Sequence, residues 1–439
     1  MQGNSAEMQD ANNKTRICIT LPLAYPLFNA SFKGPFGGWE VRISLVAREL
    51  AKRGRFEVFL VVGDYGQSHV DMIDGVHLVS WRNRDIWGIP PRITNNSIAS
   101  WNPFPYGSIP YSFWHRAQKR IFATLSDFFP GEAFDYIGEI RILQANIAIY
   151  DEIKADIYIV PGNSFLSAEV ASYCSKRRKK YVFLSGSDLD YHPEIKENPE
   201  SKDIYGLPHS LKLYSIQQAH AHIVQSENQA RMLNDTYHRS SFIISNPIDL
   251  DKKFNRNPDP QFILWVGKSD ERVKRPSLVF ELAQRMPEFQ FIVIMNIVNI
   301  NSYLKSMRLA QNIPNIRLIE QVSFDVIESY FADARVHLNT SSFEGFPNTY
   351  LQAAKYGVPT VAMTVDPDGM LSLHSCGLVS GNDLDRCEEN IKRLMKDDQL
   401  CAELSRNSLR YVCQYHDKEK VVQNYEQALE TVLSVERIE

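Results

Sequence analysis

The sequence predicts an α/β protein with two domains, each built around a parallel sheet. Apolar strand segments alternate with amphipathic helical segments along the chain, and a strand–helix–strand order implies parallel neighbouring strands. The alternation stops once, at a polar, proline-bearing stretch over residues 255–260, and then resumes. Such a stretch is typical of an interdomain linker. At 439 residues, the chain is long enough for two or three domains.

The first strand–helix–strand unit predicts a ligand-facing loop near the start of the chain. Residues 16–21 and 56–62 read as buried strands, with an amphipathic helix between them. The adjacent glycines Gly37 and Gly38 follow the first strand and precede the helix. Glycines at the carboxyl end of a strand let a ligand approach the backbone closely. An ordinary turn is the alternative explanation for this pair.

Two later strands of the first domain are followed by polar loops. Residues 157–160 and 181–184 read as strands, and their loops contain Asn163, Asp188 and His192. Because ligands bind at the carboxyl ends of parallel strands, we expect these side chains to face a substrate.

Residues 81–136 differ from the rest of the chain in being rich in aromatic residues and prolines. They could form an acceptor pocket or a membrane-facing edge. Packing beneath the loop as a separate apolar cluster is the favoured interpretation. The basic run over residues 176–180 similarly suggests either contact with anionic lipids or, as favoured here, a solvated helix end.

The second domain contains the most informative stretch, a loop and short helix over residues 341–359 between two strands. Pro347 suits the first helical position, and Gly357 suits a left-handed position just past the helix end. The helix start is expected to present unpaired N–H groups at Phe346, Asn348 and Thr349, which attract a phosphate. Glu344 lies just before it and can accept hydrogen bonds from a polyol. The sequence therefore suggests a nucleotide sugar as ligand.

Composition excludes several other classes. Apolar residues make up 44% and charged residues 23% of the chain, and the net charge of −4 gives no case for nucleic acid. None of the six cysteines forms a Cys-x-x-Cys pair, which fits reduced thiols. The first fourteen residues are polar and no apolar run is long enough to span a bilayer. We therefore expect a cytoplasmic protein, with peripheral contact at the inner membrane face left open.

The run Glu344-Gly345-Phe346-Pro347-Asn348, followed by Leu351, Ala353 and Gly357-Val358-Pro359, resembles the donor-binding signature of the retaining glycosyltransferases of family 4. The resemblance implies the GT-B fold, with two Rossmann-like, doubly wound domains facing a cleft and a C-terminal helix crossing back to the first domain. It divides the chain into the following expected segments: a disordered tail (1–14), an acceptor-side domain (15–247) with the aromatic insertion, a nucleotide-sugar domain (248–415) and the final helix (416–439).

The same resemblance implies roles for individual residues. The family signature has two glutamates separated by seven residues; Glu344 matches the first, which contacts sugar hydroxyls, whereas Gln352 replaces the second, which holds the ribose. A neutral acceptor at this position costs about tenfold in affinity. The expected catalytic residues are Glu344, Lys268 and Lys274, with the two lysines neutralising the diphosphate. Besides Gln352, the expected donor-binding residues are Gly267, Gly345, Phe346, Pro347, Asn348, Thr349, Gln321 and Val322. Arg272 or Arg275 could replace either lysine.

On the acceptor side, Gly37 and Gly38 match the family's glycine loop. Asn163 stands where the family often has a histidine.

The expected function is transfer of a sugar, with retention, from a nucleotide diphosphate-sugar to a glycan or lipid-linked acceptor in surface polysaccharide synthesis. No metal cofactor is expected, and the oligomeric state stays open. A metal-dependent transferase of the other common architecture is one alternative, because Asp188-Leu189-Asp190 and Asp366-Pro367-Asp368 are Asp-x-Asp triplets. A GT-B sugar epimerase is a second alternative, and a nucleotide-sugar-binding protein without transferase activity, supported by Gln352 and Asn163, is a third.

Overall fold

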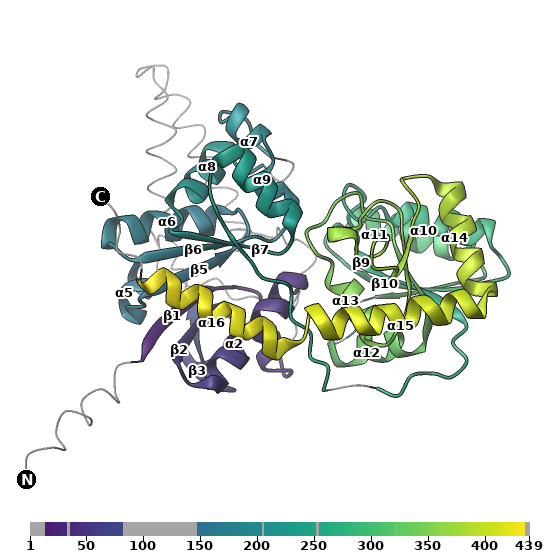
Figure 1. The fold of residues 1–439 in the computed structure, drawn as a ribbon, viewed down its shortest axis with the longest axis horizontal. Helices are drawn as coiled ribbons and strands as arrows, with labels where there is room; N and C mark the ends of the chain where they lie inside the picture. Colours follow the sequence, from purple (N-terminus) through teal and green to yellow (C-terminus); the bar gives the residue numbers. More distant parts are fainter. Residues whose placement is uncertain are drawn as a thin grey trace, which may run out of the picture. The chain divides into compact units, whose positions relative to one another are not determined.

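The computed structural model describes residues 14–32, 36–81, 147–203, 206–251, 254–320, 322 and 324–434. The predicted tail and nearly all of the aromatic segment 81–136 lie outside these ranges. The chain divides into two compact units (Figure 1). The N-terminal unit comprises residues up to Val224, Met232–Phe242 and the chain from Asn424 on, and the C-terminal unit comprises Gln225–Arg231 and Ile243–Gln423. This division differs from the expected boundary after residue 247.

The N-terminal unit contains an eight-stranded sheet with the order β3-β4-β2-β1-β5-β6-β7-β8. Its strands are β1 (Thr15–Thr20), β2 (Phe56–Gly63), β3 (Val70–Ile73), β4 (Val76–Trp81), β5 (Ile157–Pro161), β6 (Lys180–Leu184), β7 (Ala221–Val224) and β8 (Phe242–Ile243). The sequence analysis missed the hairpin of β3 and β4, which pair antiparallel. From β4 to β7 the paired strands run parallel.

The helices of this unit begin and end at residues suited to those positions. They are α1 (Tyr25–Phe28), α2 (Gly38–Arg53), α5 (Ile147–Ile153), α6 (Phe165–Arg177), the 3-10 helix η3 (Asp188–Tyr191), α7 (Glu194–Glu197), α8 (His209–Gln218) and the second half of α9 (Glu227–Tyr237), whose residues up to Arg231 belong to the C-terminal unit. In α2, Glu40 accepts the N–H of the N-cap Gly37 at 2.7 Å, and Gly54 ends the helix with φ 72°. The basic run over residues 176–178 is the exposed end of α6.

The C-terminal unit contains a six-stranded, all-parallel sheet with the order β11-β10-β9-β12-β13-β14. Its strands are β9 (Phe262–Lys268), β10 (Gln290–Asn296), β11 (Ile316–Glu320), β12 (Ala334–Asn339), β13 (Thr360–Ala362) and β14 (Gly377–Val379). Numbered within the unit, this is the order 3-2-1-4-5-6 of a doubly wound fold. The order reverses between β9 and β12, which is where such sheets bind ligands.

Helices cover both faces of this sheet (Figure 1). They are α10 (Pro276–Arg285), α11 (Ile300–Ala310), α12 (Phe324–Asp333), α13 (Asn348–Lys355), the 3-10 helix η4 (Pro367–Gly369), α14 (Leu384–Lys396) and α15 (Asp398–Tyr415), and the last helix of the chain is α16 (Lys418–Ser434). One apolar core joins α10, α11 and α14 to alternate strand residues such as Trp265 and Val293. A second joins α12 and α13 to intervening residues such as Leu264 and Ile294. The period-two alternation of the strands thus serves two cores.

The final helix, α16, contributes residues to both units. Lys418, at its start, pairs with Asp249 at 3.1 Å in the C-terminal unit. From Asn424 on the helix belongs to the N-terminal unit, where Arg42 donates to the Tyr425 hydroxyl at 2.9 Å and Arg53 pairs with Glu426 at 2.9 Å.

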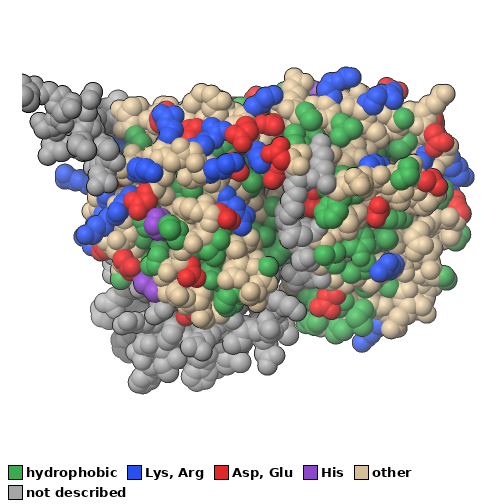
Figure 2. Space-filling model, turned by 90° about the horizontal axis from the view of Figure 1, so that it is seen from below, with side chains coloured by type: hydrophobic (Ala, Val, Ile, Leu, Met, Phe, Trp, Pro, Cys, Tyr) green, Lys and Arg blue, Asp and Glu red, His purple; other side chains and the backbone are tan. Residues whose placement is uncertain are grey.

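The surface carries both signs of charge. On the face drawn in Figure 2, Lys and Arg side chains are interspersed with Asp and Glu, as the small net charge implies. Within the described ranges, none of the helices combines the length and the apolar character that crossing a bilayer requires.

Candidate functional site

The loops after β9 and β12 meet at the point where the strand order of the C-terminal unit reverses. The Ser342 N–H donates to the Val273 carbonyl at 2.9 Å. The Thr340 hydroxyl donates to the Lys274 carbonyl at 2.6 Å and accepts the Trp265 indole N–H at 2.9 Å. Sequence-distant loops are therefore joined into one platform at the carboxyl edge of the sheet.

Arg275 locks this platform. It is a non-glycine residue in the left-handed region, with φ 47°. Its guanidinium donates to the carbonyls of Thr340 at 2.6 Å and Ser341 at 3.0 Å, to Asn382 Oδ1 at 2.6 Å and to the Thr364 hydroxyl at 3.2 Å. These acceptors occupy four of the five N–H donors of Arg275, which therefore holds loops in place. Its suggested role in place of one of the two lysines stays a prediction.

Glu344 lies at the centre of the platform. Its Oε1 atom accepts three hydrogen bonds, from Lys274 Nζ at 2.6 Å, the Ser341 hydroxyl at 2.7 Å and Asn339 Nδ2 at 3.3 Å. Burial favours the neutral acid, but Lys274 and the two polar donors outweigh it, so the pKa of Glu344 lies below its ordinary value. The side chain is therefore a carboxylate at neutral pH, and all of these contacts use the same oxygen.

The turn that opens α13 differs from the prediction in two details. Pro347 is the N-cap with ψ 122°, which is extended backbone, so the helix begins at Asn348 instead of at the proline. The Phe346 N–H is not unpaired, because it donates to Gln225 Oε1 at 3.3 Å. Thr349, the second helical residue, has no intrahelical acceptor for its N–H by the geometry of any helix start. The end of the helix matches the prediction, with Gly357 at φ 63°.

Gln352 lies in a buried polar cluster that the sequence did not reveal. Its Nε2 atom is 3.5 Å from Glu328 Oε1. Glu328 also pairs with Lys355 Nζ at 2.6 Å and accepts the Tyr356 hydroxyl at 2.8 Å. All four side chains are at most 9% exposed. Gln352 thus supplies a neutral neighbour to a buried carboxylate that already has one cation.

The remaining residues that were predicted to bind the donor are Lys268, Gly267, Val322 and Gln321. Lys268 is exposed at the end of β9. Gly267 has a packing role, because a Cβ there would lie 2.6 Å from the Trp265 ring. Val322 packs against the apolar cluster beneath α12. Gln321 lies outside the described residues.

In the N-terminal unit, the carboxylate with the most backbone contacts of these loops is Asp190, which the sequence analysis named only as part of an Asp-x-Asp triplet. It accepts the N–H groups of Asn163 at 2.9 Å, Gly186 at 2.7 Å and Ser187 at 3.0 Å. The backbone of Asn163 is therefore held by the Asp190 carboxylate. Of the other candidates, Asp188 opens η3 next to the N-cap Ser187, and the His192 side chain is 52% exposed and 3.9 Å from Glu194.

The glycine loop of the N-terminal unit is followed by Trp39. Its indole N–H donates to the Gly186 carbonyl at 3.1 Å. A Cβ would lie 2.0 Å from this ring at Gly162 and 2.1 Å from it at Gly186. Glycines at these strand ends therefore allow Trp39 to pack on the edge of the sheet, directly after Gly37 and Gly38.

The second Asp-x-Asp triplet is engaged by backbone amides. Asp366 accepts the N–H of Leu371 at 2.7 Å and of Ser372 at 3.2 Å, and Asp368 accepts that of Glu227 at 3.1 Å. In the part of the chain that the structure describes, no group of three or more His, Cys, Asp or Glu side chains is arranged to hold a metal ion.

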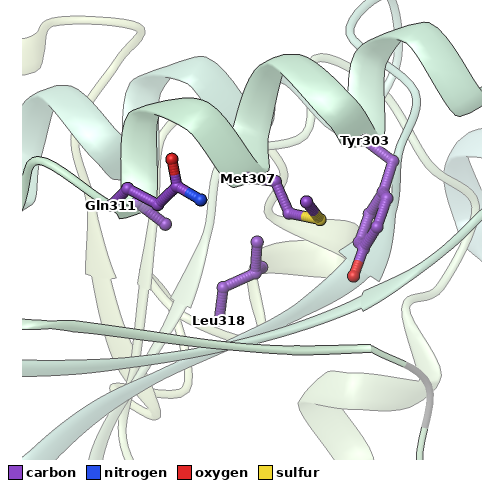
Figure 3. Close-up of a pocket in the computed structure, with 5 residues that line it drawn as sticks. Tyr303, Met307, Gln311 and Leu318 are labelled. Atoms are coloured by element: carbon purple, nitrogen blue, oxygen red, sulfur yellow. The ribbon is translucent and has the colours of Figure 1, made fainter.

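A cavity elsewhere in the C-terminal unit does not fit the predicted ligand. It lies between α11 and the edge strand β11 and is lined by Tyr303, Met307, Ala310, Gln311 and Leu318 (Figure 3). None of these side chains is charged, so the lining offers nothing to balance a diphosphate. The Glu344 platform remains the candidate site.

Comparisons with known proteins bear on the fold and on the family of the C-terminal part. Residues 260–397 match the family model described as Glycosyl transferases group 1. No curated protein sequence matches the chain. The solved structures include a sucrose-phosphate synthase from Thermosynechococcus elongatus, which is 14% identical with a TM-score of 0.69, over 96% of this chain and all of that one.

Two further structures show the same fold. A trehalose-6-phosphate synthase, OtsA, is 12% identical with a TM-score of 0.66, over 96% of this chain and all of that one. HepE from Anabaena, in complex with UDP and glucose, is 13% identical with a TM-score of 0.61, over 95% of this chain and all of that one. The GT-B prediction is confirmed. The prediction of a glycosyltransferase is confirmed at the level of the group 1 domain over residues 260–397.

Proposed function

We propose that the protein moves a sugar from a nucleotide diphosphate-sugar to an acceptor hydroxyl, with retention of the anomeric configuration. The observation that carries this proposal is the way Glu344 is held. Lys274, Ser341 and Asn339 all bind Oε1, which fixes the carboxylate plane and leaves Oε2 to accept from sugar hydroxyls. Charge-assisted hydrogen bonds to a fixed carboxylate orient a polyol strongly.

The same platform can hold the diphosphate. The start of α13 lies two residues past Phe346 and attracts an anion through its first N–H groups and its dipole. Lys274 Nζ contacts Glu344 at 2.6 Å, so the bound donor would share this cation between carboxylate and phosphate. Lys268, exposed at the end of β9 on the same edge of the sheet, adds a second positive charge.

Catalysis would follow from stabilising the leaving group. As the glycosidic bond breaks, negative charge grows on the departing phosphate, and groups already aimed at that charge lower the barrier. In a front-face attack, the leaving phosphate oxygen takes the proton of the acceptor hydroxyl. This route needs no histidine in the position of Asn163. It also assigns no step to a metal ion, and we propose that the reaction is metal-independent.

The proposed acceptor is the hydroxyl group of a second sugar. A glycan or lipid-linked sugar would supply the hydroxyl, in surface polysaccharide assembly on the cytoplasmic side of a membrane. Support comes from the resemblance of the Glu344 motif to family 4, whose members serve such pathways. Assay of the product anomer with a panel of lipid-linked and free glycans would test this; inversion would reject retention.

The donor site is tested by a thermal-shift panel of UDP-, GDP-, ADP- and dTDP-sugars, each with magnesium and with a chelator. A ligand present at one hundred times its dissociation constant adds about 2.7 kcal/mol of stability. We expect one nucleotide class to raise Tm in the presence of chelator, and Glu344→Ala to lose that shift. Absence of stabilisation by every nucleotide would reject the proposal. Stabilisation without turnover across many acceptors would favour a binding protein.

A further inference from the structure

The turn that opens α13 is held by a buried amide, Asn246. Asn246 is 1% exposed. Its Nδ2 lies 2.9 Å from the Phe346 carbonyl, 3.1 Å from Asn348 Oδ1 and 3.0 Å from Gln225 Oε1. A carbonyl can only accept, which fixes the nitrogen on that side. Two amide hydrogens are thus shared among three acceptors around the same turn.

The partners of Asn246 complete a closed network. Gln225 Oε1 also accepts the Phe346 N–H at 3.3 Å, so both backbone groups of Phe346 are fixed. His416 Nδ1 donates to the Asn246 carbonyl at 2.8 Å, and its ring centroid lies 4.7 Å from that of Phe346. Asn246 comes three residues after one passage of the chain between units, and His416 comes seven residues before another.

Buried side-chain atoms without a hydrogen-bond partner occur on Asn246 itself and on two histidines. Among the residues described for the C-terminal unit, the buried side-chain atoms without a hydrogen-bond partner are Asn246 Oδ1, His416 Nε2 and His337 Nε2. His416 contacts Phe346, and His337 lies 5.8 Å, ring to ring, from Tyr350 in the first turn of α13. Buried polar atoms without a partner are rare and destabilising, so each calls for an explanation, such as a functional role or a bound water.

We propose that Asn246 is a positioning residue of the donor site, which shapes the turn at Phe346–Asn348 for a diphosphate. The inference rests on the proposed function, because it assumes that this turn receives the phosphates. Asn246 itself is buried behind the turn and acts through the Phe346 carbonyl and the Asn348 side chain. Loss of the amide would let the turn relax, so the N–H groups that follow would no longer converge on one anion.

The chain offers a matched control in Asn315. Its Nδ2 also holds three acceptors, the carbonyls of Ala283 at 3.0 Å, Met286 at 3.0 Å and Phe289 at 2.8 Å. It lies in the same unit, between α11 and β11, and has no contact with α13 among the described residues. Asn246→Ala and Asn315→Ala therefore remove the same chemistry from two places, only one of which adjoins the proposed site.

The experiment measures Tm and, by calorimetry, the Kd of UDP, GDP, ADP and dTDP for the full chain and both variants. We expect both variants to lose stability, but only Asn246→Ala to raise the Kd of the nucleotide, by about tenfold. With the matching donor sugar, its KM should rise while kcat changes little. Gln225→Ala, which frees the Phe346 N–H, should weaken binding in the same direction and serves if Asn246→Ala does not fold.

Two results separate the inference from the function beneath it. If the wild-type chain binds a nucleotide and Asn246→Ala or Gln225→Ala binds it equally well, the positioning role is wrong and the donor site stands. If Asn315→Ala weakens nucleotide binding as much as Asn246→Ala does, Asn246 contributes to general stability and has no positioning role. If the wild-type chain binds none of the four nucleotides, the proposed function fails and the inference fails with it.

Discussion

Each unit places a carboxylate at the carboxyl edge of its sheet, but the two carboxylates are bound in opposite ways. Asp190 in the N-terminal unit is 5% exposed and uses both oxygens, Oδ1 for the Asn163 N–H and Oδ2 for those of Gly186 and Ser187. Glu344 in the C-terminal unit receives a cation and two polar side chains on Oε1 alone. In the first arrangement both oxygens hold loops, whereas in the second all of these contacts fall on one oxygen, as the proposed sugar site requires.

The largest effect that would test this contrast is loss of transfer on Glu344→Gln. The amide keeps the shape but removes the charge that orients the sugar and balances Lys274. We expect kcat/KM to fall by about a thousandfold, which is about 4 kcal/mol of transition-state stabilisation. Because the amide oxygen can still accept from Ser341 and Asn339, the loss of stability should be smaller than the loss of transition-state stabilisation. Turnover at the wild-type rate would remove Glu344 from the site.

Asp190→Ala should show the reverse pattern. It leaves three backbone N–H groups without their acceptor, at about 1 kcal/mol each, so denaturant titration should show a loss of about 3 kcal/mol. Nucleotide affinity should stay within about twofold, because the C-terminal unit is untouched. His192→Ala is the control, since a half-exposed side chain usually contributes less than about 0.5 kcal/mol. A drop in affinity without destabilisation would give Asp190 a ligand-binding role instead.

The sequence predicted the series of strands and helices because apolar periodicity is a local signal. The antiparallel β3–β4 hairpin was missed, although Asp74-Gly75 between two apolar runs is a local hairpin signal, and both residues have positive φ. Glu344 and Gly357 were found because a contiguous motif contains them.

The roles of Asp190, Arg275 and Asn246 in holding loops were not predicted, because these roles depend on contacts that the sequence does not encode locally. Asn246 and Phe346 are 100 residues apart in the chain, and Arg275 and Ser341 are 66 apart. Neither a motif nor a periodicity encodes such a pairing. Only the fold brings these residues together.

Buried histidines give the two units different acid sensitivity. Burial lowers the pKa of His222 in the N-terminal unit to about 3, and those of His337 and His416 in the C-terminal unit to about 3 and about 4. Below pH 6.5 these histidines bind protons in the unfolded chain, whereas in the folded chain their lowered pKa values keep them neutral. The free energy of unfolding therefore falls as pH decreases. Each such histidine contributes up to about 1.4 kcal/mol per pH unit.

His416→Phe tests this sensitivity. The pH dependence of unfolding between about pH 6.5 and 4 should become shallower by the contribution of one histidine. Phenylalanine suits the position because Phe346 and Tyr411 already pack against the ring, at 4.7 Å and 5.4 Å. The slope, measured by urea titration at several pH values, is the readout, since the substitution also removes the bond to the Asn246 carbonyl. An unchanged slope would mean that His416 takes up a proton in the folded state.

The smallest expected effect is a change in nucleotide affinity when a glutamate replaces Gln352 and supplies a carboxylate for the ribose. Glutamate at this position should strengthen ribose binding, by at most about tenfold. Glu328 Oε1 lies 3.5 Å from the Gln352 amide nitrogen, and Glu328 pairs with the cation Lys355. Gln352→Glu alone would therefore place two carboxylates beside one lysine, and their repulsion would raise the pKa of one of them. Combining it with Glu328→Gln keeps one negative charge beside Lys355.

We therefore expect the double variant to bind a nucleoside diphosphate more tightly than Gln352→Glu does. The gain should vanish with a 2′,3′-dideoxy nucleotide, which lacks the ribose hydroxyls. Weaker binding by the double variant than by the wild-type chain would show that Gln352 does not face the ribose. Its amide would then serve Glu328, as the backbone amides around Asp190 serve that carboxylate.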